Sequence, residues 1–148
     1  MTTLTYDINI NAPKAKTWDV LADFANLHWT RTIKDVRYLS EKRGGVGTVR
    51  HCDLSDGGYI VERITQWDEG NGYTYAIDDA RDPVAPSSYV IWSLSGDEER
   101  SNVRFEVNYK LKYGVFGAIM NALIAKKKFS KQIAIFMEEL KCHMEKEN

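Results

Sequence analysis

Apolar and polar residues alternate along much of the chain, which is the pattern of half-buried β-strands. Residues 3–10 show it first, with Leu4, Ile8 and Ile10 on one face of an expected strand that ends near Asn11. Six further strands are expected between turn clusters rich in glycine, aspartate and asparagine. Their ranges are 33–41, 46–54, 58–68, 72–79, 87–96 and 102–113. The pattern predicts seven strands, mostly joined as hairpins.

Two parts of the chain change to a helical spacing. A helix is expected over residues 13–24, because Asn11 can cap it and Pro13 suits its first turn. A short irregular or helical piece follows at 25–32. From Val115 onwards apolar residues recur every three or four positions over about 30 residues. This spacing predicts a single long amphipathic helix at the C-terminal end.

This order of elements predicts an α+β fold with two short helices between the first and second strands. Of the expected helices, only the last is long enough to cover one face of the sheet, so the sheet must curve around it. The middle of such a concavity is often too wide for side chains to fill, and we therefore expect a ligand cavity. Since no repeat or linker interrupts the pattern, residues 1–148 are expected to form a single domain.

Composition and charge argue against several classes of partner. The 20 basic and 21 acidic side chains balance, which argues against the basic face of a nucleic-acid-binding protein. Apolar runs fall short of the ~20 residues of a spanning helix, so no stable membrane insertion is expected. The N-terminal sequence lacks the features of a secretory signal, so a cytoplasmic location is expected. The sequence does not indicate an oligomeric state.

Cysteine and histidine positions do not suggest a metal site. Cys52 and Cys142 have no Cys-x-x-Cys spacing, and His28 and His51 lie in different expected elements. Metal sites and disulfide frameworks normally show closer and repeated spacings. We therefore expect two reduced thiols, no metal and no cofactor.

Four segments carry a recognisable pattern: INAP at 10–13 leading into TWDVL at 17–21, GVGTVR at 45–50, VERI at 61–64 and YTYAI at 73–77. Together they resemble the SRPBCC superfamily, also described as START-like or Bet v 1-like, which includes polyketide cyclases and dehydratases, lipid-transfer START domains and plant abscisic-acid receptors. The resemblance covers essentially the whole chain and implies the helix-grip fold, a seven-stranded curved antiparallel sheet around a long C-terminal helix. Members of this superfamily cyclise, dehydrate, transfer or sense small molecules, so the fold alone decides none of these functions.

Strand alternation predicts which side chains face the cavity. Tyrosines among them can offer a hydroxyl to a polar end of the ligand and a ring to its apolar part. The expected ligand-binding residues are Arg31, Cys52, Leu54, Ile60, Glu62, Ile64, Tyr75, Ile77, Tyr89, Ile91, Phe105, Val107, Tyr109, Phe116, Met120 and Leu123.

Glu62 is the unusual member of this set, because Ile60 and Ile64 flank it on a face expected to be buried. A buried carboxylate is costly unless it is paired, which makes Glu62 a candidate ligand anchor or general acid/base. Two other interpretations stand beside this one. Glu62 can be a structural carboxylate paired with Arg50, or a register shift can place Arg63 inward and Glu62 in solvent. The resemblance favours the cavity, since the hormone-receptor branch has a cavity-facing glutamate in a similar Glu-Arg-hydrophobic context.

The resemblance also makes Arg31 a candidate ligand-binding residue. The hormone-receptor branch has a cationic residue before its second strand that reaches the carboxylate of the ligand, while an arginine in a loop is commonly a solvated surface group. The gate sequence of that branch is absent, with Ser-Asp-Gly-Gly at 55–58 in its place, so plant hormone sensing is not carried over.

Three functions follow from these expectations. The first is binding of a small hydrophobic or amphipathic ligand, such as a lipid, a polyketide-like or an aromatic molecule, in an internal cavity. The second is a polyketide cyclase or dehydratase type of enzyme, in which Glu62 is the general acid/base and Tyr75 or Tyr89 polarises a carbonyl. The third is a protein-interaction module whose core is filled by its own side chains.

Overall fold

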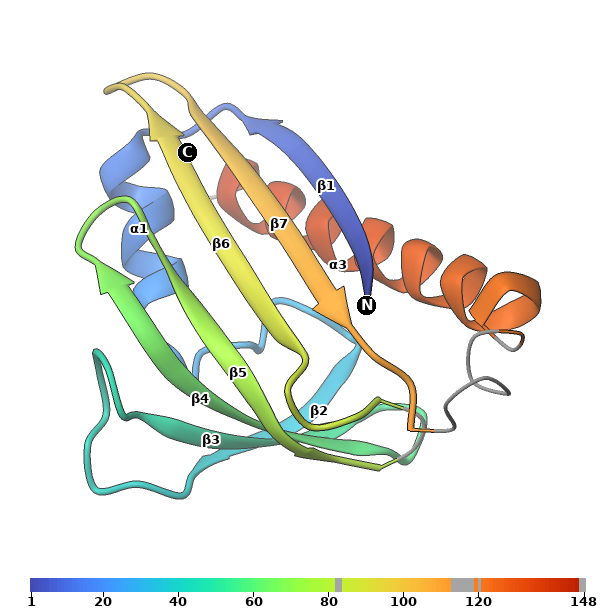
Figure 1. Ribbon diagram of the computed structural model, residues 1–148. Helices are drawn as coiled ribbons and strands as arrows, with labels where there is room; N and C mark the ends of the chain where they lie inside the picture. Colours follow the sequence, from blue (N-terminus) through green and yellow to red (C-terminus); the bar gives the residue numbers. More distant parts are fainter. Residues whose placement is uncertain (82–83, 113–118, 120, 147–148) are drawn as a thin grey trace.

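Seven antiparallel strands form one sheet in the computed structural model, which describes residues 1–81, 84–112, 119 and 121–146 (Figure 1). Six of them follow one another as a meander, and the first strand joins the far side by pairing with the last, giving the order β1-β7-β6-β5-β4-β3-β2. The strands are β1 (Thr2–Ile10), β2 (Ile33–Tyr38), β3 (Val49–Leu54), β4 (Tyr59–Asp68), β5 (Gly72–Ala80), β6 (Tyr89–Gly96) and β7 (Ser101–Tyr109).

The C-terminal helix lies against the concave side of this sheet. A short π-helical segment η1 (Asn121–Ala125) leads into α3 (Lys126–Lys146), and Figure 1 shows the sheet bending around α3. Met137 and Leu140 of α3 are fully buried in the same cluster as the inward residues of the strands. The predicted curved seven-stranded sheet around a long C-terminal helix is confirmed. The seventh strand was expected over residues 102–113 but ends at Tyr109, because residues 110–112 leave the ladder.

Helix α1 (Lys14–Ala22) is shorter than the expected helix 13–24. Pro13, and not Asn11, is its N-cap residue, and no side chain caps the helix. The Lys14 amide instead donates to the carbonyl of Asp97 in the β6–β7 turn, at 2.9 Å. This bond satisfies one of the free donors at the start of the helix and ties α1 to the end of the sheet.

The second short helix expected between the first two strands is not formed. Residues 25–32 make isolated turns, in which the Asn26 amide donates to Asp23 and the Thr30 amide to Leu27. The Trp29 indole N–H donates to the carbonyl of Asn26 at 3.0 Å. Because these bonds are local and do not repeat along the segment, the chain forms a loop that leads to β2.

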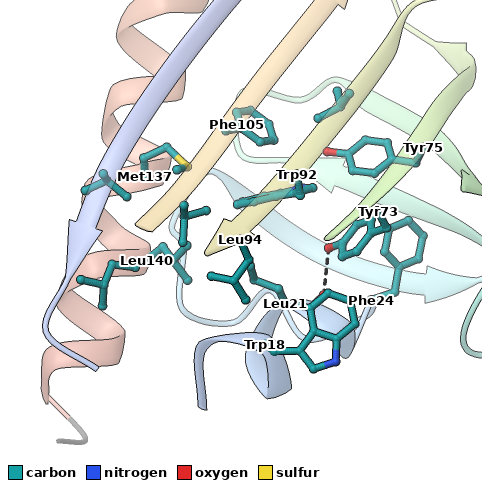
Figure 2. Packing of buried hydrophobic residues seen from close by; sticks show 14 of the residues in the cluster. Trp18, Leu21, Phe24, Tyr73, Tyr75, Trp92, Leu94, Phe105, Met137 and Leu140 are labelled. Carbon is teal, nitrogen blue, oxygen red and sulfur yellow. Dashed lines mark hydrogen bonds between the residues drawn. The ribbon is translucent and has the colours of Figure 1, made fainter. Parts of the chain in front are cut away.

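The core is rich in aromatic rings, which Figure 2 shows packed between the sheet, α1 and α3. Trp92 and Phe105 lie on neighbouring strands with ring centroids 4.5 Å apart, and Phe24 contacts Tyr73 edge-on at 5.9 Å. Offset and edge-on pairs of this kind add to the stabilisation from burial. None of the helices in the described ranges is long and apolar enough to cross a membrane.

Candidate functional site

A partly open cavity of about 490 Å³ lies between the concave face of the sheet and α3. Its volume falls in the range of small-molecule pockets, roughly 300–1,000 Å³. Apolar side chains from the strands, the 25–32 loop and α3 form most of its wall. The lining residues are Leu27, Arg31, Thr32, Ile33, Arg50, Leu54, Ser55, Asp56, Ile60, Glu62, Tyr75, Phe105, Gln132, Ile133, Ile135 and Phe136.

An ion pair between Arg50 and Glu62 forms the buried polar part of this wall. The two residues lie directly opposite each other in the β3–β4 register, and Arg50 Nε donates to Glu62 Oε1 at 2.9 Å. Their side chains are only 5% and 7% exposed. Since both residues line the cavity, two opposite charges lie side by side in a largely apolar space.

The Arg50 guanidinium is held on several sides. Its Nη1 donates to the backbone carbonyl of Phe24, and its Cζ lies 3.7 Å from the centroid of the Phe24 ring. The centroid of the Tyr75 ring lies 5.2 Å from the same Cζ atom. Burial is the largest influence and lowers the pKa of Arg50, but Glu62, Cys52, Tyr75 and Tyr73 together outweigh burial, so the pKa is raised. Arg50 therefore carries its positive charge in the site.

Nearby groups respond to the same burial. The Cys52 thiol lies 3.6 Å from Glu62 Oε1, and burial together with the Glu62 charge raises the pKa of Cys52 to about 12. Burial also raises the pKa of Tyr75 well above its ordinary value. Figure 2 shows the Tyr75 hydroxyl pointing inward beside Trp92 and Phe105. At neutral pH the ion pair therefore has a neutral thiol behind the cavity wall and a neutral phenol on it.

The structure brings six of the predicted ligand-binding residues to the cavity wall. They are Arg31, Leu54, Ile60, Glu62, Tyr75 and Phe105. Arg31 lies at the mouth, with its side chain 77% exposed and its Nε 3.8 Å from Glu139 Oε2. Other predicted residues lie inside the fold but away from the cavity wall: Cys52, Ile64, Ile77, Val107 and Tyr109.

The inward face expected for β6 was wrong. Tyr89 and Ile91 lie on the outer face, whereas Val90, Trp92 and Leu94 are buried opposite Val107, Phe105 and Val103. Residues 89–92 are apolar or aromatic at every position, so alternation does not distinguish the two faces there.

The expected contribution from the start of the C-terminal helix also differs. Leu123 is 74% exposed, and Phe116 and Met120 lie outside the described residues. The π-helical turn η1 carries an additional residue per turn, which puts Leu123 out of phase with the buried stripe that continues along α3. Ile133 and Phe136 of α3, which lie about three to four turns beyond Leu123, line the cavity instead.

Arg50 was anticipated only as a partner of Glu62, yet it lines the cavity itself. Its position on β3 has the same parity as Cys52 and Leu54, which were expected to face inward. That parity was the signal in the sequence. Phe24, whose ring and carbonyl hold the guanidinium, lies just after α1 and has no pattern that marks it.

A larger groove of about 640 Å³ lies elsewhere, between the start of α1 and the β4–β5 and β6–β7 turns, lined among others by Pro13, Trp18 and Asp97. The charged residues around it are solvated, and it has no buried ion pair. We therefore place the candidate site in the cavity beside α3. Across the described residues, no three His, Cys, Asp or Glu side chains gather as a metal site would need.

Comparison with known proteins agrees with this architecture. A family model described as polyketide cyclase / dehydrase and lipid transport matches residues 1–145. No curated protein matches the chain in sequence.

Solved structures with the same fold share little sequence with this chain. A START superfamily protein from Mycobacterium smegmatis superimposes with a TM-score of 0.80 at 14% identity over 99% of each chain. XoxI from Bacillus cereus superimposes with a TM-score of 0.76 at 21% identity, covering 97% of this chain and 96% of the XoxI chain. Ara h 8.0201, a Bet v 1 homologue, gives 0.73 at 18% identity over 97% of each chain. These likenesses show the helix-grip fold, and since the family model spans nearly the whole chain, the protein belongs to the polyketide cyclase / dehydrase and lipid transport family.

Proposed function

We propose that this protein binds a small amphipathic molecule in the cavity beside α3. The observation that carries the proposal is a buried ion pair, Arg50 with Glu62, on the wall of an otherwise mostly apolar cavity of about 490 Å³. Apolar walls provide affinity through burial, while a few placed polar groups orient the ligand. The polar end of the ligand would lie at the ion pair, and its apolar part along Ile133 and Phe136.

The energetics of buried charge support this assignment. A buried ion pair is often no more stabilising than apolar residues of the same volume, because desolvation offsets the attraction between the charges. Arg50 and Glu62 are therefore poorly explained as a means of stabilising the sheet. A role in recognising a polar group accounts for their position on the cavity wall.

Aromatic rings favour planar ligands among the expected classes. Tyr75, Phe105 and Phe136 all line the cavity, and the Phe105 and Phe136 ring centroids are 5.7 Å apart. Such rings make offset or edge-on contacts with a flat aromatic or conjugated molecule. Lipids remain a second class, in keeping with the family description. The cytoplasmic location expected from the N-terminal sequence stays a prediction.

Native mass spectrometry of the purified protein tests the proposal directly. A ligand retained from the host would appear as a one-to-one complex and could be identified after denaturation. Ile60→Trp fills the cavity and should abolish the complex, whereas Ile91→Trp, at a similarly half-buried position on the outer face, should retain it. Equal retention by both variants would place the ligand outside this cavity.

An enzymatic function is the second candidate, and one observation favours it. Both hydrogen bonds of Glu62 to described residues use Oε1, so Oε2 is left for a substrate proton, with the Tyr75 hydroxyl on the same wall. In this proposal Glu62 is the general acid/base and Tyr75 polarises a carbonyl. Full turnover by Glu62→Gln on the identified ligand would remove Glu62 from that role. A module with a filled core fits less well, because side chains leave the cavity open.

A further inference from the structure

The charges at the buried wall of the cavity cancel each other. Arg50 Nε and Glu62 Oε1 are 2.9 Å apart, and both side chains are almost completely removed from solvent. A ligand group near one of these charges therefore lies near the other as well. A carboxylate placed there would be attracted by Arg50 and repelled by Glu62, and it would lose its own hydration.

The other charged groups that line the cavity cannot substitute for a free buried cation. Arg31 lies at the mouth, is 77% exposed and is already near Glu139, while Asp56 is exposed at the rim. Exposed charges are screened by water and salt and contribute little to binding at depth. The interior of the cavity is therefore dominated by a neutral pair.

The pair nevertheless keeps hydrogen-bonding capacity. Arg50 uses Nε and Nη1 for Glu62 and Phe24, which leaves Nη2 without a partner among the described residues. Glu62 uses Oε1 for Arg50 and Cys52, which leaves Oε2 in the same condition. Among contacts between described residues, the pair therefore keeps one donor, Nη2, and one acceptor, Oε2, that a ligand can meet.

We propose that the cavity selects ligands with an uncharged polar end that carries a hydrogen-bond acceptor beside a donor, as in a primary amide or a hydroxy ketone, and excludes free carboxylates and ammonium groups. The acceptor of the ligand meets Arg50 Nη2, and its donor meets Glu62 Oε2. This inference rests on the proposed binding function and specifies the ligand class for the same site. It also removes the carboxylate-binding role that the resemblance implied for Arg31.

Three probes with one aromatic skeleton test the inference on the wild-type protein by isothermal titration calorimetry. They are naphthamide, naphthoate and naphthylmethylammonium, which share a naphthalene ring and differ in the charge of the polar end. We expect naphthamide to bind about tenfold or more tightly than either ion, because an ion would add an unpaired charge to the cavity.

Removing one charge of the pair should change this order. In Glu62→Gln the Arg50 charge loses its partner, and naphthoate should then bind more tightly than naphthamide. Asp78→Asn is the matched control, since it also removes one carboxylate, but from the exposed Arg63–Asp78 pair on the outer face. We expect Asp78→Asn to keep the wild-type order. The wild-type comparison stands by itself if Glu62→Gln does not fold.

The possible results separate this inference from the function on which it rests. If none of the probes binds the wild-type protein, both the proposed function and the inference are wrong. If naphthoate binds the wild type as tightly as naphthamide, the cavity binds amphipathic molecules but the selection for an uncharged end is wrong. A reversed order in Glu62→Gln, with an unchanged order in Asp78→Asn, supports the inference.

Discussion

Arg50 and Glu62 are interdependent at the scale of single residues. Each is buried, and the partner is what makes the burial of its charge tolerable. The stacking of the guanidinium on the Phe24 ring adds a further contact that an apolar replacement would retain only in part.

We predict that Arg50→Met destabilises the protein by about 3–5 kcal/mol, because it leaves the Glu62 carboxylate buried without a counter-charge. The double variant Arg50→Met/Glu62→Leu should recover most of this loss, since it removes both charges and keeps the volume. Urea unfolding curves of the wild type and the two variants give the comparison. A double variant as unstable as Arg50→Met would show that the pair stabilises the fold in its own right.

The sequence was informative about single residues where a polar group interrupts an apolar face. Glu62 was expected to face inward, and Arg50 was named as its possible partner. In the structure, Glu62 pairs with Arg50 and also lines the cavity. Tyr89 and Ile91 were misplaced because no polar residue in that run marks the outer face. The sequence of a strand predicts its buried face only when the residues on its two faces differ in polarity.

At the scale of the elements, Gly72 fixes the start of β5 against β6. Its φ is +146°, and a Cβ at this position would lie 2.1 Å from the carbonyl oxygen of Trp92. That oxygen belongs to the backbone of the neighbouring strand and cannot move aside without disturbing the ladder. The close approach of the two strands at the Gly72–Ser93 pair therefore requires glycine.

We predict that Gly72→Ala lowers the free energy of unfolding by about 2–4 kcal/mol, through backbone strain and the contact with Trp92. Gly44→Ala is the matched control, because nothing lies within 4 Å of its Cβ and its φ is not positive. It should change stability by no more than about 0.5 kcal/mol. Thermal denaturation of both variants measures the difference, and similar melting temperatures would contradict the assignment.

Element type was predicted more reliably than element ends. Alternation and turn residues identified all seven strands of the described sheet, because period-two patterns extend over many residues. The loop at 25–32 and the π-helical start of the last helix follow from individual hydrogen bonds and from packing, which no local pattern records. The cavity wall contributed by α3 was shifted along the helix for the same reason.

For the whole molecule, the buried protons of the core predict how stability depends on pH. Burial raises the pKa of Cys52 from 9.0 to about 12 and raises that of Tyr73 and Tyr75 above 10.0. In the unfolded chain these groups lose their protons at their ordinary values, whereas the folded protein retains them. Between about pH 9 and 12 the folded state therefore binds more protons, and stability falls as pH rises.

We predict that the free energy of unfolding begins to fall near pH 9, by up to about 1.4 kcal/mol per pH unit for each of these groups. Cys52→Ala should move the onset toward pH 10, where the tyrosines of the unfolded chain titrate. Cys142→Ala, which removes an exposed thiol, should leave the onset unchanged. Urea unfolding at a series of pH values tests this, and a flat profile from pH 8 to 11 would exclude it.

The pairing of β1 with β7 has a consequence for folding during synthesis, because the two strands are far apart in the sequence. Of the seven strands in this sheet, β1 is synthesised first and its partner β7 is synthesised last, with Thr2 opposite Tyr109. At about 5–20 residues per second, the first strand waits on the order of ten seconds for β7, and longer for α3, which packs over it. Throughout that interval Leu4, Ile8 and Ile10 have no native cover. Synthesis, and not the folded state, is therefore the stage at which the apolar face of β1 is exposed for longest.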